Sequence, residues 1–295
     1  MTSQNDTYDK IGTTAKMIAY LRTFTDIPFT KEIAEETDAK QDFETLAGKG
    51  GRSMTELAFA LEARYKATDH IIARHRVHQV LEVAAGLSPR GLAMTEDPNF
   101  TYVVTDLPQI LEQEQAIAES ILVKRHAQRS NLYFRIANAL DRDDLFKAAA
   151  PFQRGMPIAV VTEGLLPYLT REEKGTLAAN IGDLLTQYGG IWICPDVTPR
   201  QTWKRFSEVD SDVRQRHQNI SRATGRDFEK NAFEDDDDMR RFFTDAGYAI
   251  EEYPHVNVLD ELSAVRLTRL NRDEVREILR VLQTLILTVR AGCGR

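Results

Sequence analysis

Small, acidic and amide residues follow four short apolar runs of this chain, and side chains of these types can bind a polar ligand. The first run ends at Ala84–Gly86 and the second at Asp106. The third is followed by Asn138 and Ala139, and the fourth ends at Glu163. In an open parallel sheet, ligands bind beyond the carboxyl ends of the strands, where the strand order reverses. The four positions therefore predict one binding site.

The first two positions indicate a cofactor that contains a nucleoside. Gly86 lets the backbone pass close to a ligand, and Asp106, about twenty residues later, can accept hydrogen bonds from two ribose hydroxyls. The glycine patterns that bind a pyrophosphate or a triphosphate are absent from this turn. Asp106 taken alone also fits a helix N-cap, because Pro108 stands near a helix start.

The other two positions extend this interpretation. The side chains of Asn138 and Ala139 can flank an adenine ring, with Asn138 or Asp141 near its amino edge. Glu163 ends a buried run and is followed at once by Gly164. A buried carboxylate is costly unless it meets a partner, and a sulfonium amino acid is a ligand that would supply one.

Seven strand-length runs alternate with helical patterns, which predicts a doubly wound, mostly parallel α/β sheet of seven strands. Nearly continuous apolar strands are typical of a sheet that is covered on both faces. The predicted strands are Val77–Ala85, Phe100–Thr105, Asn131–Ala137, Pro157–Thr162, Gly190–Cys194, Tyr248–Tyr253 and Gln283–Arg290. The predicted helices are Thr13–Phe24, Met54–Ala73, Glu112–His126, Arg142–Ala150, Arg171–Tyr188, Met239–Ala246 and Asp273–Val281.

The length of 295 residues and this alternation favour a single domain over 1–295 with two additions. Residues 1–75 are predicted to form an N-terminal helical cap. A lid insertion is expected at about 197–235, where the alternation stops for about forty residues, because long connections inside a compact domain are usually functional. The acidic run Glu234–Asp238 is interpreted as the cap of the helix that follows it, and less readily as a cation site.

Composition excludes several partners. The formal net charge of −7 provides no field that would attract nucleic acid. No apolar stretch is long enough to span a membrane. Two cysteines make neither a disulfide framework nor a metal site, and the polar N-terminus lacks the features of a secretory signal. We therefore expect a cytoplasmic protein with no bound metal. The sequence specifies no oligomeric state.

The chain resembles the leucine carboxyl methyltransferase family, which includes polyketide O-methyltransferases of the tetracenomycin type and belongs to the class I methyltransferases that use S-adenosylmethionine (SAM). Thr14-Ala15 and Arg22 are similar to the first helix of that family. The other matching segments are Ala63–Asp69 in the second helix, Gln79–Leu87 at the first strand and turn, Thr105–Pro108 at the ribose-binding turn, and Glu163–Leu169, which is the most specific.

The resemblance implies that SAM is the cofactor and S-adenosylhomocysteine (SAH) the product. Arg64 is expected to pair with the methionine carboxylate, as suits a guanidinium fork. Asp106 would hold the ribose hydroxyls, and Glu163 would face the amino end of the methionine moiety. The full set of implied cofactor-binding residues is Arg64, Glu82, Ala84, Gly86, Asp106, Leu107, Asn138, Ala139, Glu163 and Tyr168.

Two departures indicate a divergent subgroup. Family members usually carry aspartate, threonine and arginine after the glycine turn, whereas this chain has Ser88-Pro89-Arg90. Glu82 stands where many members are neutral. These departures bear on the acceptor more than on the cofactor.

Methyl transfer to oxygen is an in-line displacement, and orientation supplies much of the rate enhancement. A carboxylate acceptor is already ionised at pH 7, whereas a phenol requires a base. His217 and His255 are the only plausible bases, and no catalytic residue is assigned, so a small-molecule carboxylate is favoured as acceptor. Tyr20 and Trp203 are candidates for apolar walls around it. Two alternatives stay open, a non-catalytic SAM-binding protein and a nicotinamide-dependent oxidoreductase.

Overall fold

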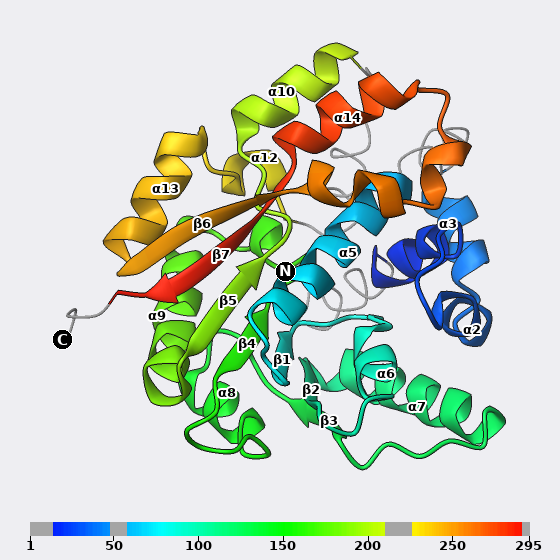
Figure 1. Ribbon diagram of the computed structural model, residues 1–295, viewed down its shortest axis with the longest axis vertical. Coiled ribbons are helices and arrows are strands. Elements are labelled where there is room, and N and C mark those ends of the chain that lie inside the picture. Colours follow the sequence, from blue (N-terminus) through cyan, green and yellow to red (C-terminus); the bar gives the residue numbers. More distant parts are fainter. Residues whose placement is uncertain (1–13, 48–57, 210–225, 291–295) are drawn as a thin grey trace, which may run out of the picture.

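The computed structural model describes residues 14–47, 58–209 and 226–290. One seven-stranded sheet runs through this part of the chain in the order β3-β2-β1-β4-β5-β7-β6 (Figure 1). Strands β1 to β5 are parallel, and β7 runs antiparallel to both β5 and β6. The strands are β1 Gln79–Val83, β2 Thr101–Asp106, β3 Leu132–Ile136, β4 Ile158–Val161, β5 Gly190–Cys194, β6 Tyr248–Pro254 and β7 Gln283–Val289. All seven predicted strands are confirmed, with shifts at their ends.

Helices cover both faces of the sheet, which confirms the doubly wound architecture (Figure 1). On one face, α8 (Arg142–Ala148), α9 (Arg171–Tyr188) and α13 (Asp236–Asp245) pack on Leu81, Val160 and Trp192. On the other face, α5 (Ala58–Arg74), α6 (Arg90–Met94) and α7 (Pro108–Lys124) pack on Val80 and Val161. Strands such as β4 are therefore buried along their whole length, as their apolar sequence predicts.

The strand register determines which turns become neighbours. Glu82 of β1 pairs with Val104 of β2 on one side and with Val161 of β4 on the other. The chain passes outward from β1 to β3 and then returns to β4, so the order reverses between β1 and β4. The turns after β1, β2 and β4 therefore meet at one edge, where a ligand site is expected.

The N-terminal cap is helical in residues 14–22, α2 (Thr30–Glu36) and α3 (Ala39–Ala47). Phe29 and Ile33 pack against α7, and ion pairs join Glu32 and Glu36 to the end of α7. Tyr20 packs on Phe24 and Phe43 inside a small apolar cluster of the cap itself. Its predicted place as a wall of the acceptor site stays a prediction.

The insertion after β5 contributes α10 (Arg200–Val209) and α12 (Phe228–Asn231). The intervening part of the predicted lid, with His217, lies outside the described residues. Asp235 caps α13, its side chain accepting a hydrogen bond from the Asp238 backbone N–H at 2.8 Å. The interpretation of the acidic run as a helix cap is therefore confirmed.

The C-terminal segment positions α5. The 3-10 helices η3 (His255–Glu261) and η4 (Ala264–Leu267), with α14 (Arg272–Val281), pack against the apolar side of α5. Glu62 is fully buried on α5 and accepts hydrogen bonds from the backbone N–H groups of Ser263 and Ala264 at 2.9 and 2.8 Å. In the described residues, no helix is both long enough and apolar enough to cross a membrane.

Candidate functional site

The turn after β1 brings backbone close to the cap. Ala84 and Gly86 both adopt left-handed conformations, with φ of 54° and 63°. A Cβ on Gly86 would lie 3.3 Å from the Cβ of Ala15, so the helix of residues 14–22 crosses directly over this turn. Glycine at position 86 thus removes both a backbone strain and a steric conflict.

Asp106 braces that turn from the end of β2. Its Oδ2 accepts a hydrogen bond from the Gly86 backbone N–H at 2.8 Å, and its Oδ1 accepts one from the Leu107 N–H at 2.7 Å. The N-cap of α7 is Leu107, so the interpretation of Asp106 as a helix cap is wrong. Burial raises the pKa of Asp106 to about 6. Each carboxylate oxygen keeps a second lone pair that can accept from a ribose hydroxyl.

Three arginines from distant parts of the chain converge on Glu163. Its Oε1 accepts from Arg22 Nη2 at 2.6 Å and from Arg64 Nε at 3.0 Å, and its Oε2 accepts from Arg90 Nη2 at 2.9 Å. Burial tends to raise the pKa of Glu163, but the three guanidinium groups, that of Arg64 foremost, hold it well below its ordinary value. The partner that this buried carboxylate requires is therefore supplied by the protein itself, and its contact with the methionine amino group stays a prediction.

Arg64 keeps its outer nitrogens for a ligand. Only its Nε is bonded, to Glu163, and no residue in the described part of the chain accepts a hydrogen bond from Nη1 or Nη2. The side chain is 17% exposed and so is not sealed inside the protein. A guanidinium with two free N–H edges matches a carboxylate, which is the role that the sequence predicts for it.

Arg90 is fully buried behind this pair and neutralises the remaining carboxylates. It donates to Asp69 at 2.8 Å and to Glu82 Oε1 at 2.8 Å, and its guanidinium lies 4.3 Å from the ring centroid of Tyr65. The other oxygen of Glu82 accepts from the Tyr102 hydroxyl at 2.7 Å. Both oxygens of Glu82 are thus bonded within the protein, and a role towards the cofactor stays a prediction.

Tyr168 lies where the cap and the insertion meet. It ends the 3-10 helix η2 (Leu166–Tyr168), and its ring packs edge-on against Phe228 of α12 at 4.7 Å. Its hydroxyl is hydrogen-bonded to Thr14 of the cap, and burial raises the pKa of Tyr168 to about 12. Asn231 donates to its carbonyl at 3.2 Å. Tyr168 therefore contacts both the N-terminal cap and the insertion after β5, at the carboxyl end of β4.

Asn138 and Ala139 follow β3, at the other end of the row of turns. Asn138 is exposed, and its side chain accepts from the Leu140 N–H at 3.0 Å. The Ala139 carbonyl accepts from Asn180 of α9 at 3.3 Å. Asp141 caps α8, accepting from the Asp144 N–H at 3.1 Å. The contacts of Asn138 and Ala139 with adenine stay predictions.

Asp196 is the site residue that the sequence interpretation missed. It follows β5 as Glu163 follows β4, and its Oδ2 accepts from the Gly164 N–H at 2.6 Å. Its Oδ1 is buried and has no hydrogen-bond partner in the described residues. The rule that ligands bind at the carboxyl ends of strands, applied to β5 as well, would have found it.

His255, one of the two predicted bases, is buried after β6. Its Nε2 lies 3.0 Å from Thr284 Oγ1, and burial lowers its pKa to about 3. Such an imidazole is neutral at pH 7 but holds a proton only weakly, which makes it a poor base.

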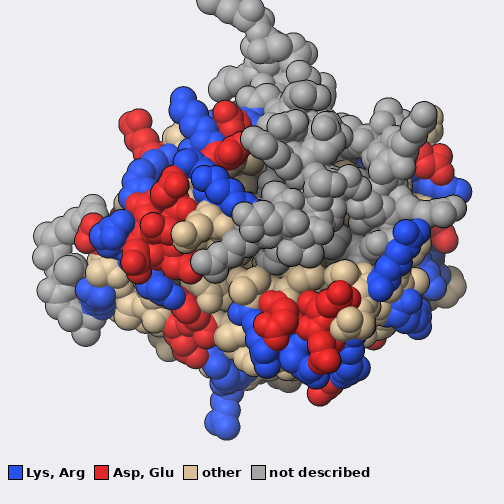
Figure 2. All heavy atoms as spheres, turned by 90° about the horizontal axis from the view of Figure 1, so that it is seen from above, with Lys and Arg blue, Asp and Glu red and all other residues tan. Residues whose placement is uncertain are grey.

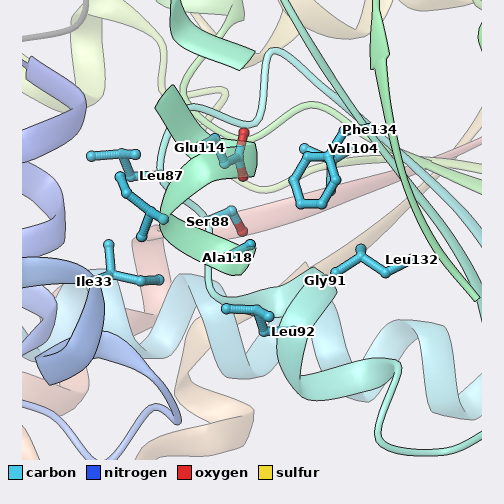
Figure 3. A pocket seen from close by; sticks show the side chains of 11 residues that line it. Ile33, Leu87, Ser88, Gly91, Leu92, Val104, Glu114, Ala118, Leu132 and Phe134 are labelled. Atoms are coloured by element: carbon cyan, nitrogen blue, oxygen red, sulfur yellow. The ribbon is translucent and has the colours of Figure 1, made fainter. Parts of the chain in front are cut away.

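A small hollow lies behind the glycine turn, between α2, α6, α7 and the sheet. Figure 3 shows the Glu114 side chain among Leu87, Ser88 and Val104. Its Oε2 is buried without a partner in the described part of the chain, and burial raises the pKa of Glu114 well above its ordinary value. A protonated carboxyl suits this apolar lining.

No group of three or more potential metal ligands occurs among the described residues. The residues that are present fit SAM instead. Along one edge lie the Arg64 Nη nitrogens, which have no acceptor among the described residues, the spare lone pairs of Asp106, and a turn at Gly86 where a Cβ would be crowded.

The comparisons agree with this geometry. The fold is that of the class I methyltransferases. A DUF574 family protein of Streptomyces avermitilis has a TM-score of 0.57 at 13% identity, over 94% of this chain and 97% of that one. A solved methyltransferase structure from Thermobifida fusca has a TM-score of 0.53 at 13% identity, over 94% of each chain. The model of the leucine carboxyl methyltransferase family matches residues 14–182. The chain therefore belongs to the leucine carboxyl methyltransferase family, whose cofactor is SAM.

Three bacterial relatives are described as SAM-dependent methyltransferases. That of Mycobacterium ulcerans is 36% identical over 109 residues, or 36% of this chain and 34% of the relative. That of Saccharopolyspora erythraea is 26% identical over 61% of this chain and 66% of the relative. That of Mycolicibacterium paratuberculosis is 28% identical over 88% and 86%. The first match thus spans about a third of its relative, and the last spans most of both chains.

Proposed function

We propose that this protein transfers the methyl group of SAM to an oxygen of a small molecule, with a carboxylate as the favoured acceptor. One observation carries the proposal: Nη1 and Nη2 of Arg64, which have no hydrogen-bond acceptor in the described part of the chain, lie at the same edge of the sheet as the Gly86 turn that Asp106 braces. These groups suit the two polar ends of the cofactor.

SAM supplies an activated methyl on a sulfonium; in the transfer the carbon–sulfur bond breaks as the carbon–oxygen bond forms. The protein contributes by positioning the cofactor and by excluding water from the site. Arg64 would hold the methionine carboxylate, and Asp106 the ribose. The cap helix over Gly86 and the insertion over Tyr168 would exclude water, because they lie on the same edge. Correct orientation alone accounts for several kcal/mol of rate enhancement.

A carboxylate acceptor is favoured because it is ionised at pH 7 and requires no base. His255 is buried with a low pKa, which makes it a poor base for an acceptor that would have to lose a proton. A phenol is the second candidate, which Asp196 favours: burial raises the pKa of this carboxyl to about 6, so that it can accept a proton near neutral pH.

Calorimetric titration with SAM, SAH and NAD tests the cofactor. Wild type is expected to bind SAM and SAH but not NAD. Asp106→Ala should weaken the binding of SAM and of SAH by about tenfold or more, because it removes hydrogen bonds to the ribose. The control is Asp143→Ala, whose side chain is 79% exposed on α8. Binding of NAD alone would instead support an oxidoreductase.

Methyl transfer itself distinguishes an enzyme from a non-catalytic SAM-binding protein. Purified protein with methyl-labelled SAM and the small-molecule fraction of a cell extract should yield a labelled product. Alkali releases the label as methanol from a methyl ester but not from an aryl methyl ether. Alkali-stable label would favour the phenol, and tight SAM binding without any labelled product would favour the non-catalytic protein.

A further inference from the structure

One carboxylate oxygen of Asp196 is hydrogen-bonded within the described part of the protein and the other is not. Its Oδ2 is bonded to the Gly164 backbone N–H at 2.6 Å, which fixes the side chain against the turn after β4. Its Oδ1 is buried and has no partner in the described part of the chain. A buried, unpaired carboxylate oxygen is costly in the free protein, so a donor from a ligand is the natural complement.

The neighbours of Asp196 place it inside the site. The charges of Arg64 and Glu163 both act on its titration, in opposite directions, and Asp196 in turn acts on those of Tyr168 and Lys174. Asp196 nevertheless makes no ion pair with Arg64, whose one bonded acceptor among the described residues is Glu163. Among the described residues, Glu163 receives three guanidinium donors, whereas Asp196 receives only backbone N–H groups. Of these two carboxylates, Asp196 has the greater capacity for a ligand.

The position of Asp196 points to the acceptor. The Arg64, Gly86 and Asp106 groups that suit the cofactor lie at β1, β2 and the helix above them, whereas Asp196 follows β5 and precedes the insertion that carries α10 and α12. It stands beside Gly164 and the Tyr168 segment, under the meeting point of cap and insertion.

We propose that Asp196 Oδ1 receives a hydrogen bond from an O–H or N–H group that the methyl acceptor carries at, or next to, its reacting oxygen. This inference rests on the proposed function and narrows its substrate class. A phenol would offer its own hydroxyl, and a carboxylic acid would offer a neighbouring hydroxyl or ammonium group. A plain carboxylic acid without such a donor would meet an unpaired carboxylate and bind poorly.

A cofactor analogue tests this without knowledge of the acceptor. In sinefungin, an amine-bearing carbon replaces the methyl-bearing sulfur, so its ammonium group occupies the place from which the methyl is transferred. Wild type should bind sinefungin about tenfold tighter than SAH, because the ammonium gains a charge-assisted hydrogen bond to Asp196. In Asp196→Asn, sinefungin should bind more weakly, so that its affinity becomes nearly equal to that of SAH. The affinity for SAH itself should change by less than about threefold.

The controls separate the possible failures. Asp143→Asn, on the exposed surface of α8, should keep the wild-type preference. Asp196→Ser removes the carboxylate as a second variant and should likewise lose the preference for sinefungin, and thermal unfolding with SAH verifies the fold of each. An unchanged preference in folded Asp196→Asn overturns the inference, as does a collapse of SAH affinity, which would make Asp196 a cofactor ligand. Failure of wild type to bind either compound would refute the proposed function itself.

Discussion

At the residue scale, the site is a set of buried charges that nearly cancel. Arg22, Arg64 and Arg90 all contact Glu163, and Arg90 also contacts Glu82 and Asp69. Burial raises the pKa of Asp69 to about 6. Burying such groups is tolerable only when each finds an opposite charge and hydrogen bonds. The result is a fixed guanidinium at Arg64, whereas Asp196 keeps one oxygen without a hydrogen-bond partner in the described residues.

Asp196 should therefore lower stability as the pH rises. Burial raises its pKa from 3.8 to about 6, so the folded protein holds this proton more tightly than the unfolded chain. The stability that the folded protein gains by holding this proton is fully present below the unfolded pKa and is lost as the pH rises through 6. Relative to wild type, Asp196→Asn should gain about 1 kcal/mol of unfolding free energy between pH 5 and pH 8. Urea unfolding at both pH values measures it, and an equal difference at both would contradict it.

At the element scale, α5 carries Arg64, the residue proposed to bind the cofactor, and is held in place by the C-terminal segment. Glu62 joins it to Ser263 and Ala264, and its apolar side packs on η3 and α14. Two residues further on, Arg64 faces the sheet edge and Glu163. The C-terminal segment, far from the cofactor turns in sequence, thus determines where the guanidinium lies. Arg74, at the other end of the same helix, pairs on the surface with Glu251.

The two arginines of α5 offer a matched test. Arg64→Lys should weaken SAH binding by about tenfold or more, because a shorter ammonium cannot replace a guanidinium fork. Arg74→Lys should bind SAH as wild type does, since its partner pair is exposed. Calorimetric titration of the two variants provides the comparison. Similar losses in both would show that Arg64 acts through helix stability instead of direct contact.

At the scale of the whole molecule, the net charge is negative, and the two signs of charge are mixed on the one face that Figure 2 draws. The formal net charge is −7. On the face drawn in Figure 2, lysine and arginine side chains alternate with aspartate and glutamate side chains over the described elements. Such a surface has no continuous basic stripe of the kind that tracks a phosphate backbone.

We therefore expect no specific or non-specific binding of duplex DNA near physiological salt. Fluorescence anisotropy of a labelled duplex, titrated with protein to about 10 µM, should stay flat, because non-specific binding depends on basic contacts to phosphates. A rise in anisotropy that disappears with added salt would indicate a basic patch and contradict this expectation.

Much of the fold could be predicted from local pattern. Each strand is a short apolar run between helical patterns, and strands covered on both faces must be apolar along their length. For the same reason the turns at Gly86, Asp106 and Glu163 were predicted, since they directly follow such runs. The ends of strands were less certain because local pattern is weakest there: β1 begins at Gln79, not Val77.

The sequence by itself thus determined the class of fold, the positions of the turns after β1, β2 and β4, and the family. Only the tertiary structure decided the strand order, the antiparallel β7 and the partners of Glu163. Arg22, Arg64 and Arg90 lie 141, 99 and 73 residues from it, and no periodicity links residues so far apart. The unpaired oxygen of Asp196 is likewise a property of packing, because a hydrogen bond that is missing can be recognised only when all neighbours are in place.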